Sequence, residues 1–434
     1  MTATSAAHRK IKKKAHGRAP LQAVYSRADG SVVDLPDLAA AADGGAIAKA
    51  DGADFIPLPE GSLLLTLPGR SVLAYHGSST RQIARQKGEE VSAVACALPL
   101  GYTRLALPAY AERPGAPVLP LYGYTAVAWC GDSFWVAAER TDELGSWAPH
   151  AHDAQRVHDG IALRTLEFPG SSLVAQLARC ATEYGCFTAQ NVFLRQGEAA
   201  VPVSVACNAR CIGCISEQDP GAQVKSAQER IRRRPTLEEI AELAIAHLRA
   251  VPSGMISFGQ GCEGEPLLAA PLIEQAIRAV RSATAAGTIH CNTNASDSRA
   301  LARLIDAGLR SIRVSLNAAR PEAYAAYYRP RGYSFAAVRE SLRVAAARGV
   351  AISLNLLTHP GVTDDEREME AFGALLREFP ITMVQTRTLN VDPAAYFAAV
   401  GRPRRAPIGM RPWLHWLHSE FPELRVGNFT RGFG

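Results

Sequence analysis

Three cysteines lie close together in the chain: Cys207, Cys211 and Cys214, in the spacing C-x3-C-x2-C. Thiolates are soft ligands that favour zinc, copper(I) or iron–sulfur clusters. A structural zinc site takes four protein ligands and is closed, whereas a cubane cluster held by three cysteines leaves one iron without a protein ligand. Because an iron with an open position can bind and activate a small molecule, the spacing favours a reactive iron–sulfur cluster.

Other roles for the three thiols are weaker. A zinc site would need a fourth ligand from a distant Cys or His, and no second C-x2-C pair lies nearby. Free cysteines can pack as small apolar residues, but Asn208 and Arg210 between the thiols are poor core residues. Nine cysteines in 434 residues are too few, and odd in number, for a disulfide framework, and no signal peptide is recognised.

The composition is that of an ordinary soluble globular protein of two or three domains, with 47% apolar and 20% charged residues. No apolar run is long enough for a transmembrane helix. Much of the net charge of +6 comes from residues 9–18, whose polar sequence predicts a disordered tail. A solvated tail is the simpler explanation, and contact with nucleic acid is the alternative. Free thiols fit a reducing compartment, so we expect a cytoplasmic protein without membrane partners.

Residues 20–200 have a turn-rich pattern that predicts a β-rich domain. We expect one hairpin from 62–67 and 71–75, a second from 125–129 and 134–138, and a helix over 171–183. His150, His152 and His158 lie in a polar stretch without helical register. This placement favours surface histidines over metal ligands.

The second half of the chain alternates short apolar strands with helices. Strands are predicted at 203–206, 255–258, 288–292, 311–316, 350–355 and 381–386. Thr236 and Glu239 form a capping box at the start of the helix over 237–249. Strands joined by helices imply a parallel sheet with right-handed crossovers, and six are fewer than the eight that close a full barrel.

The predicted fold class is therefore α/β: a partial (β/α)6 TIM-like barrel with a β-rich N-terminal domain and a short C-terminal extension. The predicted divisions are a basic disordered tail at 1–19, the β-rich domain at 20–200, the barrel at 201–390 and the extension at 391–434. Ligands bind beyond the carboxyl ends of the strands in such folds.

With three thiols directly after the first strand of a partial barrel, residues 202–390 resemble the radical S-adenosylmethionine (SAM) enzyme superfamily. The resemblance implies that the cysteines bind a [4Fe–4S] cluster whose fourth iron binds SAM. It also implies catalytic activity, in which SAM is cleaved reductively to a 5′-deoxyadenosyl radical that abstracts hydrogen from a substrate. Gly213 departs from the family, where many members carry an aromatic residue just before the third cysteine. Ile212 or Ile215 could cover the adenine instead.

The resemblance also implies SAM-binding residues after successive strands. Gly264 and Glu265, and less strongly Glu263, would face the SAM ammonium. Polar residues after the next three strands would hold the ribose, carboxylate and adenosine. The alternatives are a glycine-rich turn and ordinary helix capping by Asn and Ser. The cofactor-binding candidates are Gly264, Glu265, Thr293, Asn294, Ser315, Asn317 and Asn355. No catalytic residue beyond the cluster ligands is assigned.

Further residues have two explanations each. Gln385, Arg387 and Asn390 could face the substrate, or the interior Arg could pair with a carboxylate. Residues 324–333, rich in Tyr and Arg, form either a lid near the site or a polar surface loop. Cys180 and Cys186 could bind a second cluster or donate hydrogen, or they could pack between helices.

Two functional hypotheses follow. The first is a radical SAM enzyme on an unknown substrate, which could be a peptide, a small molecule or RNA, with a reductant such as flavodoxin or ferredoxin. A cobalamin-dependent variant is disfavoured because no Asp-x-His-x-x-Gly run is found. The second is a non-catalytic iron–sulfur or zinc protein that binds a partner.

Overall fold

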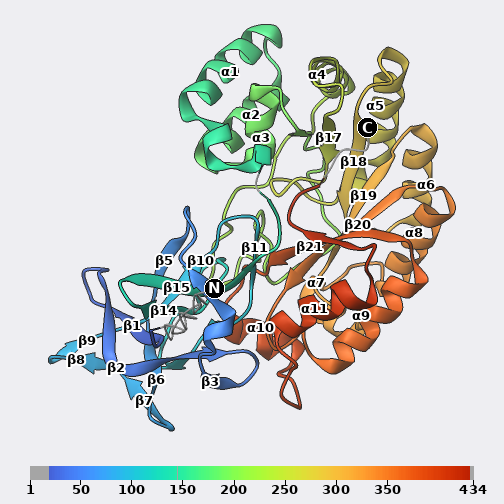
Figure 1. Ribbon diagram of the computed structural model, residues 1–434. Coiled ribbons are helices and arrows are strands. Elements are labelled where there is room, and N and C mark those ends of the chain that lie inside the picture. The colour runs from blue at the N-terminus through green and yellow to red at the C-terminus, as the bar shows by residue number, and fades with distance from the viewer. Residues whose placement is uncertain (1–18, 144, 431–434) are drawn as a thin grey trace, which may run out of the picture.

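The computed structural model describes residues 19–143 and 145–430. The predicted basic tail, apart from its last residue, lies outside the described residues. Figure 1 shows β-strands in blue and teal on one side, three helices in green above them, and a curved sheet lined by helices in yellow to red on the other side. Across the described ranges, every helix is too short or too polar to span a bilayer.

Eleven of the N-terminal strands form an antiparallel sheet, with the order β11-β15-β14-β1-β2-β6-β13 along its main path, while β5 pairs with β10 and β8 with β9 in two small separate sheets. The predicted hairpin at 125–138 is confirmed, since Val127 pairs with Val136 across a turn at Gly131. The strands are β1 (Gln22–Ser26), β2 (Val32–Asp43), β3 (Ile47–Lys49), β4 (Phe55–Pro57), β5 (Leu63–Leu67), β6 (Arg70–His76), β7 (Ser79–Ile83), β8 (Arg85–Gln86), β9 (Glu89–Glu90), β10 (Ala93–Ala97), β11 (Tyr102–Arg104), β12 (Leu107–Pro108), β13 (Tyr110–Glu112), β14 (Val127–Cys130) and β15 (Ser133–Arg140).

The predicted hairpin at 62–75 is wrong. Both strands exist, but β5 pairs with β10, while β6 pairs with β2, β7 and β13. Leu67 and Val72 instead belong to one apolar cluster with Ala93 and Tyr124. Burial in this cluster therefore decides the pairing, and the Pro68-Gly69 turn only redirects the chain.

Three helices connect the N-terminal strands to the second sheet: α1 (Ala154–Glu167), α2 (Ser172–Glu183) and α3 (Phe187–Leu194). The helix predicted over 171–183 is confirmed as α2, which Ser171 caps by accepting from the Val174 amide. His152 is buried, and its imidazole lies 2.9 Å from the Asn191 side chain. The prediction of a surface histidine is therefore wrong at this position.

The second sheet is a parallel half-barrel of seven strands in the order of the sequence. The α/β fold class is confirmed, but two details of the prediction are wrong. The first strand lies at 198–200, because the amides of Val203 and Ser204 are bonded to the Glu263 carboxylate instead of a strand. A seventh strand, β22, comes from the C-terminal segment. The strands are β16 (Glu198–Ala200), β17 (Met255–Phe258), β18 (Thr288–Thr293), β19 (Ser311–Leu316), β20 (Ala351–Thr358), β21 (Ile381–Thr388) and β22 (Arg425–Gly427).

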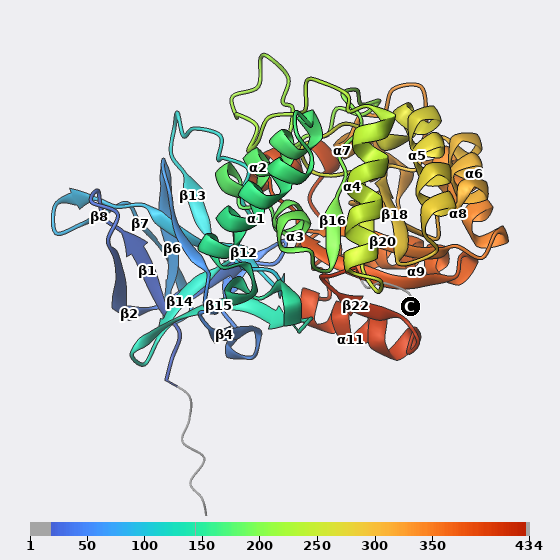
Figure 2. The ribbon, with the colours of Figure 1, turned by 90° about the horizontal axis from the view of Figure 1, so that it is seen from above.

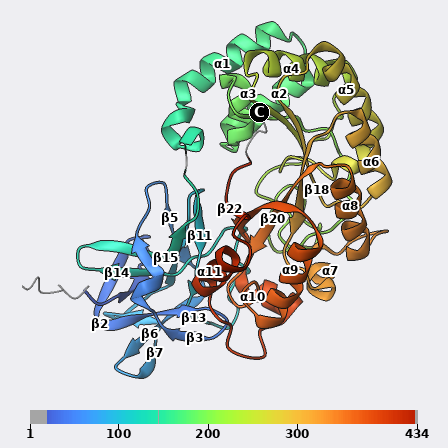
Figure 3. The same ribbon diagram turned by 45° about the vertical axis from the view of Figure 1, so that its right-hand side comes forward.

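Helices line the outer face of this curved sheet, as Figure 3 shows. The capping box at the start of α4 is confirmed, with both Thr236 and Glu239 bonds present. Along β19, Ile312 and Val314 are fully buried, whereas Arg313 and Ser315 on the inner face are only half-buried. The helices are α4 (Leu237–Ala250), α5 (Ala270–Ala283), α6 (Ser298–Ala307), α7 (Pro321–Tyr328), α8 (Phe335–Ala347), α9 (Glu366–Glu378), α10 (Pro393–Val400) and α11 (Met410–Glu420).

The N-terminal domain is joined to the half-barrel at the edge formed by β20, β21 and β22; Figure 2 shows the two side by side from above. Buried Arg104 of β11 donates to the Thr358 carbonyl at 3.1 Å. The Thr103 and Thr386 hydroxyls lie 2.6 Å apart. Because Thr358 ends β20, the N-terminal domain lies at the carboxyl ends of the strands, where ligands bind in such folds.

Candidate functional site

The three predicted cluster ligands lie on one loop that follows β16, and all three thiols are half-buried. A turn after β17 supports the start of this loop. The amides of Gly264 and Glu265 donate to the carbonyls of Ser204 and Ala206 at 2.7 and 2.8 Å. A methyl group at Gly264 would overlap the Ala206 carbonyl oxygen, so this contact requires glycine.

Helix α7 supports the other side of the cysteine loop. The amides of Arg210 and Ile212 donate to the carbonyls of Tyr328 and Tyr327 at 2.9 and 3.1 Å. Past the helix, the Arg331 amide donates to the Asn208 carbonyl at 2.8 Å. The alternative of a polar surface loop at 324–333 is wrong for residues 324–328, which belong to α7 and include buried Tyr327 and Tyr328, whereas residues 329–333 do form a loop with exposed arginines.

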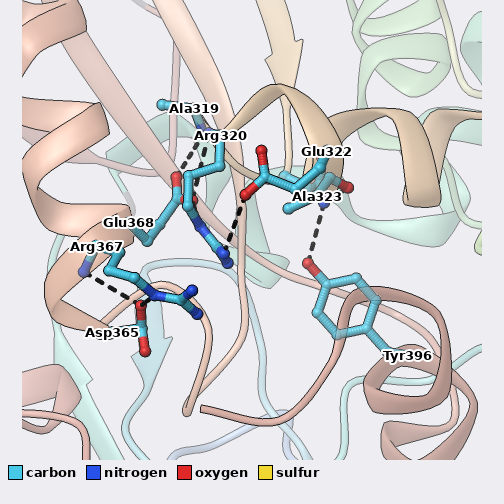
Figure 4. A network of polar contacts seen from close by, with 9 residues as sticks. Ala319, Arg320, Glu322, Ala323, Asp365, Arg367, Glu368 and Tyr396 are labelled. Atoms are coloured by element: carbon cyan, nitrogen blue, oxygen red, sulfur yellow. Dashed lines mark hydrogen bonds and ion pairs between the residues drawn. The ribbon is translucent and has the colours of Figure 1, made fainter. Parts of the chain in front are cut away.

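A network of polar contacts fixes α7 in place. Figure 4 shows Arg320, just before the helix, between Glu368 of α9 and Glu322. The Arg320 guanidinium lies 2.9 Å from the Glu368 carboxylate, which also accepts from the Ala319 amide. These contacts link the outer helix layer to the helix that holds the cysteine loop.

Asn208, between the first two cysteines, attaches the loop to the end of β18. Its amide oxygen accepts from the Asn294 side chain at 2.8 Å, and its nitrogen donates to the Ser296 hydroxyl at 2.9 Å. Sequence reasoning assigned no role to Asn208. An amide between metal-binding cysteines, opposite an Asn-x-Asn-x-Ser strand end, is the signal that could have identified it.

The thiols influence one another electrostatically. Burial raises the pKa of Cys207 to about 11, with nearby Glu265 adding to the effect and Arg230 opposing it. Burial raises the pKa of Cys211 well above its usual range, and the negative charges of the Cys214 and Cys207 thiolates raise it further. Binding to a metal deprotonates a thiol outright, and the Arg230 guanidinium lies 3.7 Å from the Cys214 sulfur.

This donor set fits an iron–sulfur cluster. Three soft, half-buried ligands are held on a loop whose backbone is hydrogen-bonded on both sides. Within the described parts of the chain, no three Cys, His, Asp or Glu side chains converge on a position for a single metal ion. A cubane cluster does not require such convergence, because each cysteine binds a different iron.

Glu263 and Glu265 are both buried, and hydrogen bonds from the protein occupy both carboxylates. Glu263 accepts four backbone amides, from Val203, Ser204, Gly259 and Gln260, at 2.7–2.8 Å. Burial raises the pKa of each carboxyl to about 7, while the hydrogen bonds lower it. Glu263 thus fixes the cysteine loop to the turn after β17.

Three of the predicted cofactor-binding residues, Glu265, Thr293 and Asn294, lie together near Cys207. The Glu265 carboxylate accepts from the Thr293 hydroxyl, from the Asn294 amide at 2.8 Å and from the Leu267 amide at 3.1 Å. Thr293 and Asn294 therefore lie against Glu265.

Ser315 and Asn355 lie on the inner face of the sheet. They are register neighbours on β19 and β20, and Gln385 of β21 pairs next to Asn355. Both candidates are half-buried, and no side-chain partner is found for either among the described residues. Asn317 differs: it is fully buried and donates to the Ala323 carbonyl and the Tyr396 hydroxyl, both at 3.1 Å.

Tyr327 occupies the space beside Gly213. A Cβ atom at Gly213 would lie 2.9 Å from the Tyr327 hydroxyl and 3.0 Å from the Asn390 carbonyl oxygen. An aromatic side chain therefore does not fit at position 213, and the nearest aromatic group comes from α7.

A cavity of about 620 Å³ opens beside the cysteine loop. Cys207 and Cys211 line it on one side, and Val118, Leu119 and Leu121 of the N-terminal domain contribute to it. Four arginines also line it: Arg210, Arg230, Arg329 and Arg331.

Comparison with known proteins decides the family. The family model described as the radical SAM superfamily matches residues 201–372, which contain the cysteine loop and the ends of four strands of the half-barrel, β17 to β20. This part of the chain is a radical SAM domain.

One curated relative of this radical SAM protein is GTP 3',8-cyclase from Chlorobaculum tepidum, 29% identical over 185 residues. The match covers 42% of this chain, which spans about half the length of that relative. Among solved structures, methylornithine synthase is 17% identical, with 62% of this chain and 77% of that chain covered and a TM-score of 0.38. A radical SAM methyltransferase from Sphaerobacter thermophilus is 20% identical, with 53% and 66% covered and a TM-score of 0.38.

The other cysteines near the site lie within helices and turns. Cys180 of α2 accepts from the Gln176 side chain at 3.3 Å, and Cys186 lies 3.2 Å from the Thr188 hydroxyl. Cys262, in the turn after β17, is buried in the same apolar core as Cys180.

Proposed function

We propose that this chain is a radical SAM enzyme that abstracts hydrogen from a substrate held in the half-barrel. The observation that carries the proposal is the cysteine loop, which is fixed by three separate elements at the carboxyl end of the sheet and opens on a cavity. Cys207, Cys211 and Cys214 would hold the cluster. The open inner face would hold SAM and the substrate.

A cluster held by Cys207, Cys211 and Cys214 would supply the electron for reductive cleavage of SAM to methionine and a 5′-deoxyadenosyl radical, the species that would abstract hydrogen from the substrate and end as 5′-deoxyadenosine. The electron must come from a reductant, for which flavodoxin or ferredoxin is our proposal. Arg329 and Arg331 are exposed beside the cysteine loop and would suit an acidic electron donor.

The residues of the chain divide into two groups in this proposal. Glu263 orients the start of the cysteine loop, whose amides its carboxylate accepts, and Glu265 holds Asn294, which in turn donates to Asn208 of the loop. Ser315 and Asn355 keep open polar groups on the inner face and are proposed to bind SAM. We propose Tyr327 in place of the missing aromatic residue at position 213, near the adenine.

The test begins with anaerobic reconstitution with iron and sulfide. We expect about four iron atoms for each chain, and 5′-deoxyadenosine after addition of SAM and dithionite. Cys211→Ala should lose both, whereas Cys186→Ala, the matched control, should keep both. Iron near eight atoms that falls by half in Cys186→Ala would indicate a second cluster instead.

The alternative is a non-catalytic iron–sulfur or zinc protein. Zinc in the purified chain, together with no 5′-deoxyadenosine from the reconstituted protein, would favour that alternative and overturn the proposal. We propose that the substrate is a peptide, a small molecule or RNA. We also propose that the protein is cytoplasmic.

A further inference from the structure

Arg387 is a cation on the inner face of the half-barrel for which the described part of the chain shows no partner. It lies on β21 opposite Leu357 of β20, two positions beyond Gln385, and is half-buried. Strand alternation places Gln385 and Arg387 on the same face. Among the described residues, no hydrogen bond or ion pair to the Arg387 guanidinium is found, although neutralising pairs are the rule for buried charges.

A second guanidinium lies deeper on the same face. Arg313 of β19 donates to the Gln385 amide oxygen at 2.8 Å and to the Thr430 hydroxyl at 2.6 Å. Both partners are neutral, and no carboxylate of the described residues lies within 4 Å of Arg313. Burial, followed by the positive charge of Arg313, lowers the pKa of Arg387 to about 10.

The surrounding acidic groups do not neutralise this pair. Asp142 is near enough to attract Arg387, but its carboxylate accepts the Asn428 and Phe429 amides at 2.8 and 3.2 Å. Glu198 of β16 attracts both arginines without contacting either. His290, beside Arg313, is neutral near pH 7, because burial lowers its pKa to about 4.

We infer that Arg387, with Arg313 beneath it, binds an anionic group of the substrate, a phosphate or a carboxylate. A guanidinium offers a planar pair of donors that matches either group. The two cations face a single uncommitted carboxylate, Glu198, so a bound anion would compensate the remaining buried charge. This inference rests on the proposed function, since it names the substrate class for that site.

The test uses the reconstituted holoprotein and two probes, inorganic pyrophosphate and malonate, titrated by calorimetry. We expect wild type to bind at least one probe, and Arg387→Gln to weaken that binding at least tenfold. Arg299→Gln is the matched control, because Arg299 is exposed on α6 and its loss changes the net charge equally. Arg387→Lys should recover part of the affinity, and it serves also if the glutamine variant fails to fold.

The same titrations with SAM separate the substrate from the SAM carboxylate. SAM affinity unchanged in Arg387→Gln, with anion affinity reduced, supports the inference. Three results would overturn the inference. Wild type and Arg387→Gln could bind both probes equally, or wild type could bind neither probe. The third is a variant that loses affinity for SAM alone. A wild-type protein that binds the probes but forms no 5′-deoxyadenosine would refute the proposed function and leave the anion site standing.

Discussion

Replacing Gly264 by alanine tests whether the turn after β17 positions the cysteine loop. The added methyl group would overlap the Ala206 carbonyl oxygen, which is backbone and cannot rotate away. Relief requires the turn and the loop to separate, which stretches the bonds from Gly264 to Ser204 and from Glu265 to Ala206, now 2.7 and 2.8 Å.

Each of those bonds contributes about 1 kcal/mol net, and overpacking costs roughly 1–3 kcal/mol more. We therefore expect Gly264→Ala to lower the free energy of unfolding of the apoprotein by about 3 kcal/mol, which leaves most domains folded. After reconstitution, the variant should hold less than half the wild-type iron, because Cys207 follows Ala206 directly.

Urea unfolding followed by circular dichroism gives the first quantity, and iron and sulfide analysis gives the second. Gly44→Ala is the control, because no atom lies within 4 Å of a Cβ there and its backbone conformation is ordinary. A Gly264→Ala protein with the stability and iron content of Gly44→Ala would refute this account of the turn.

Three further predictions concern the supports of the site. Asn208→Ala removes the contact to Asn294, so a chelator should strip iron several-fold faster than from wild type; an unchanged rate would remove Asn208 from the account. Asp392→Asn weakens the buried ion pair that joins Arg70 of β6 to the segment before α10, now 2.9 Å, and should lower the free energy of unfolding by about 2–3 kcal/mol; a change below about 0.5 kcal/mol would show that this ion pair does not stabilise the fold. Burial lowers the pKa of His247 to about 4, below its pKa in the unfolded chain. As the pH falls from 6.5 towards 4, the unfolded state therefore binds more protons at this residue than the folded state does. Between pH 7 and pH 5 the free energy of unfolding should fall by on the order of 1–2 kcal/mol from this residue, and identical pH profiles for wild type and His247→Gln would disprove it.

The chemistry-bearing parts of this chain are predictable because they depend on local spacing. The thiol spacing and the capping box at Thr236 can be identified without tertiary contacts. The strands from β17 to β21 stand out because each is apolar on its outer face. Arg313 was missed, although an arginine within the alternating run of 311–316 indicates a polar inner face.

Features set by distant contacts were not predictable. β22 has only three residues and no apolar run, and it forms through pairing with β21. The role of α7 depends on carbonyls of Tyr327 and Tyr328 that meet a loop more than a hundred residues earlier. Side-chain identity does not encode such backbone contacts. The use of Glu263 as an anchor for four amides likewise appears only once the two turns are adjacent.

The most direct test of the central claim is the stoichiometry of SAM cleavage by the reconstituted protein under dithionite. The account predicts 5′-deoxyadenosine and methionine in equal amounts from wild type, and neither from Cys207→Ala, Cys211→Ala or Cys214→Ala. A wild-type protein with a full complement of iron and bound SAM that forms no 5′-deoxyadenosine would contradict it.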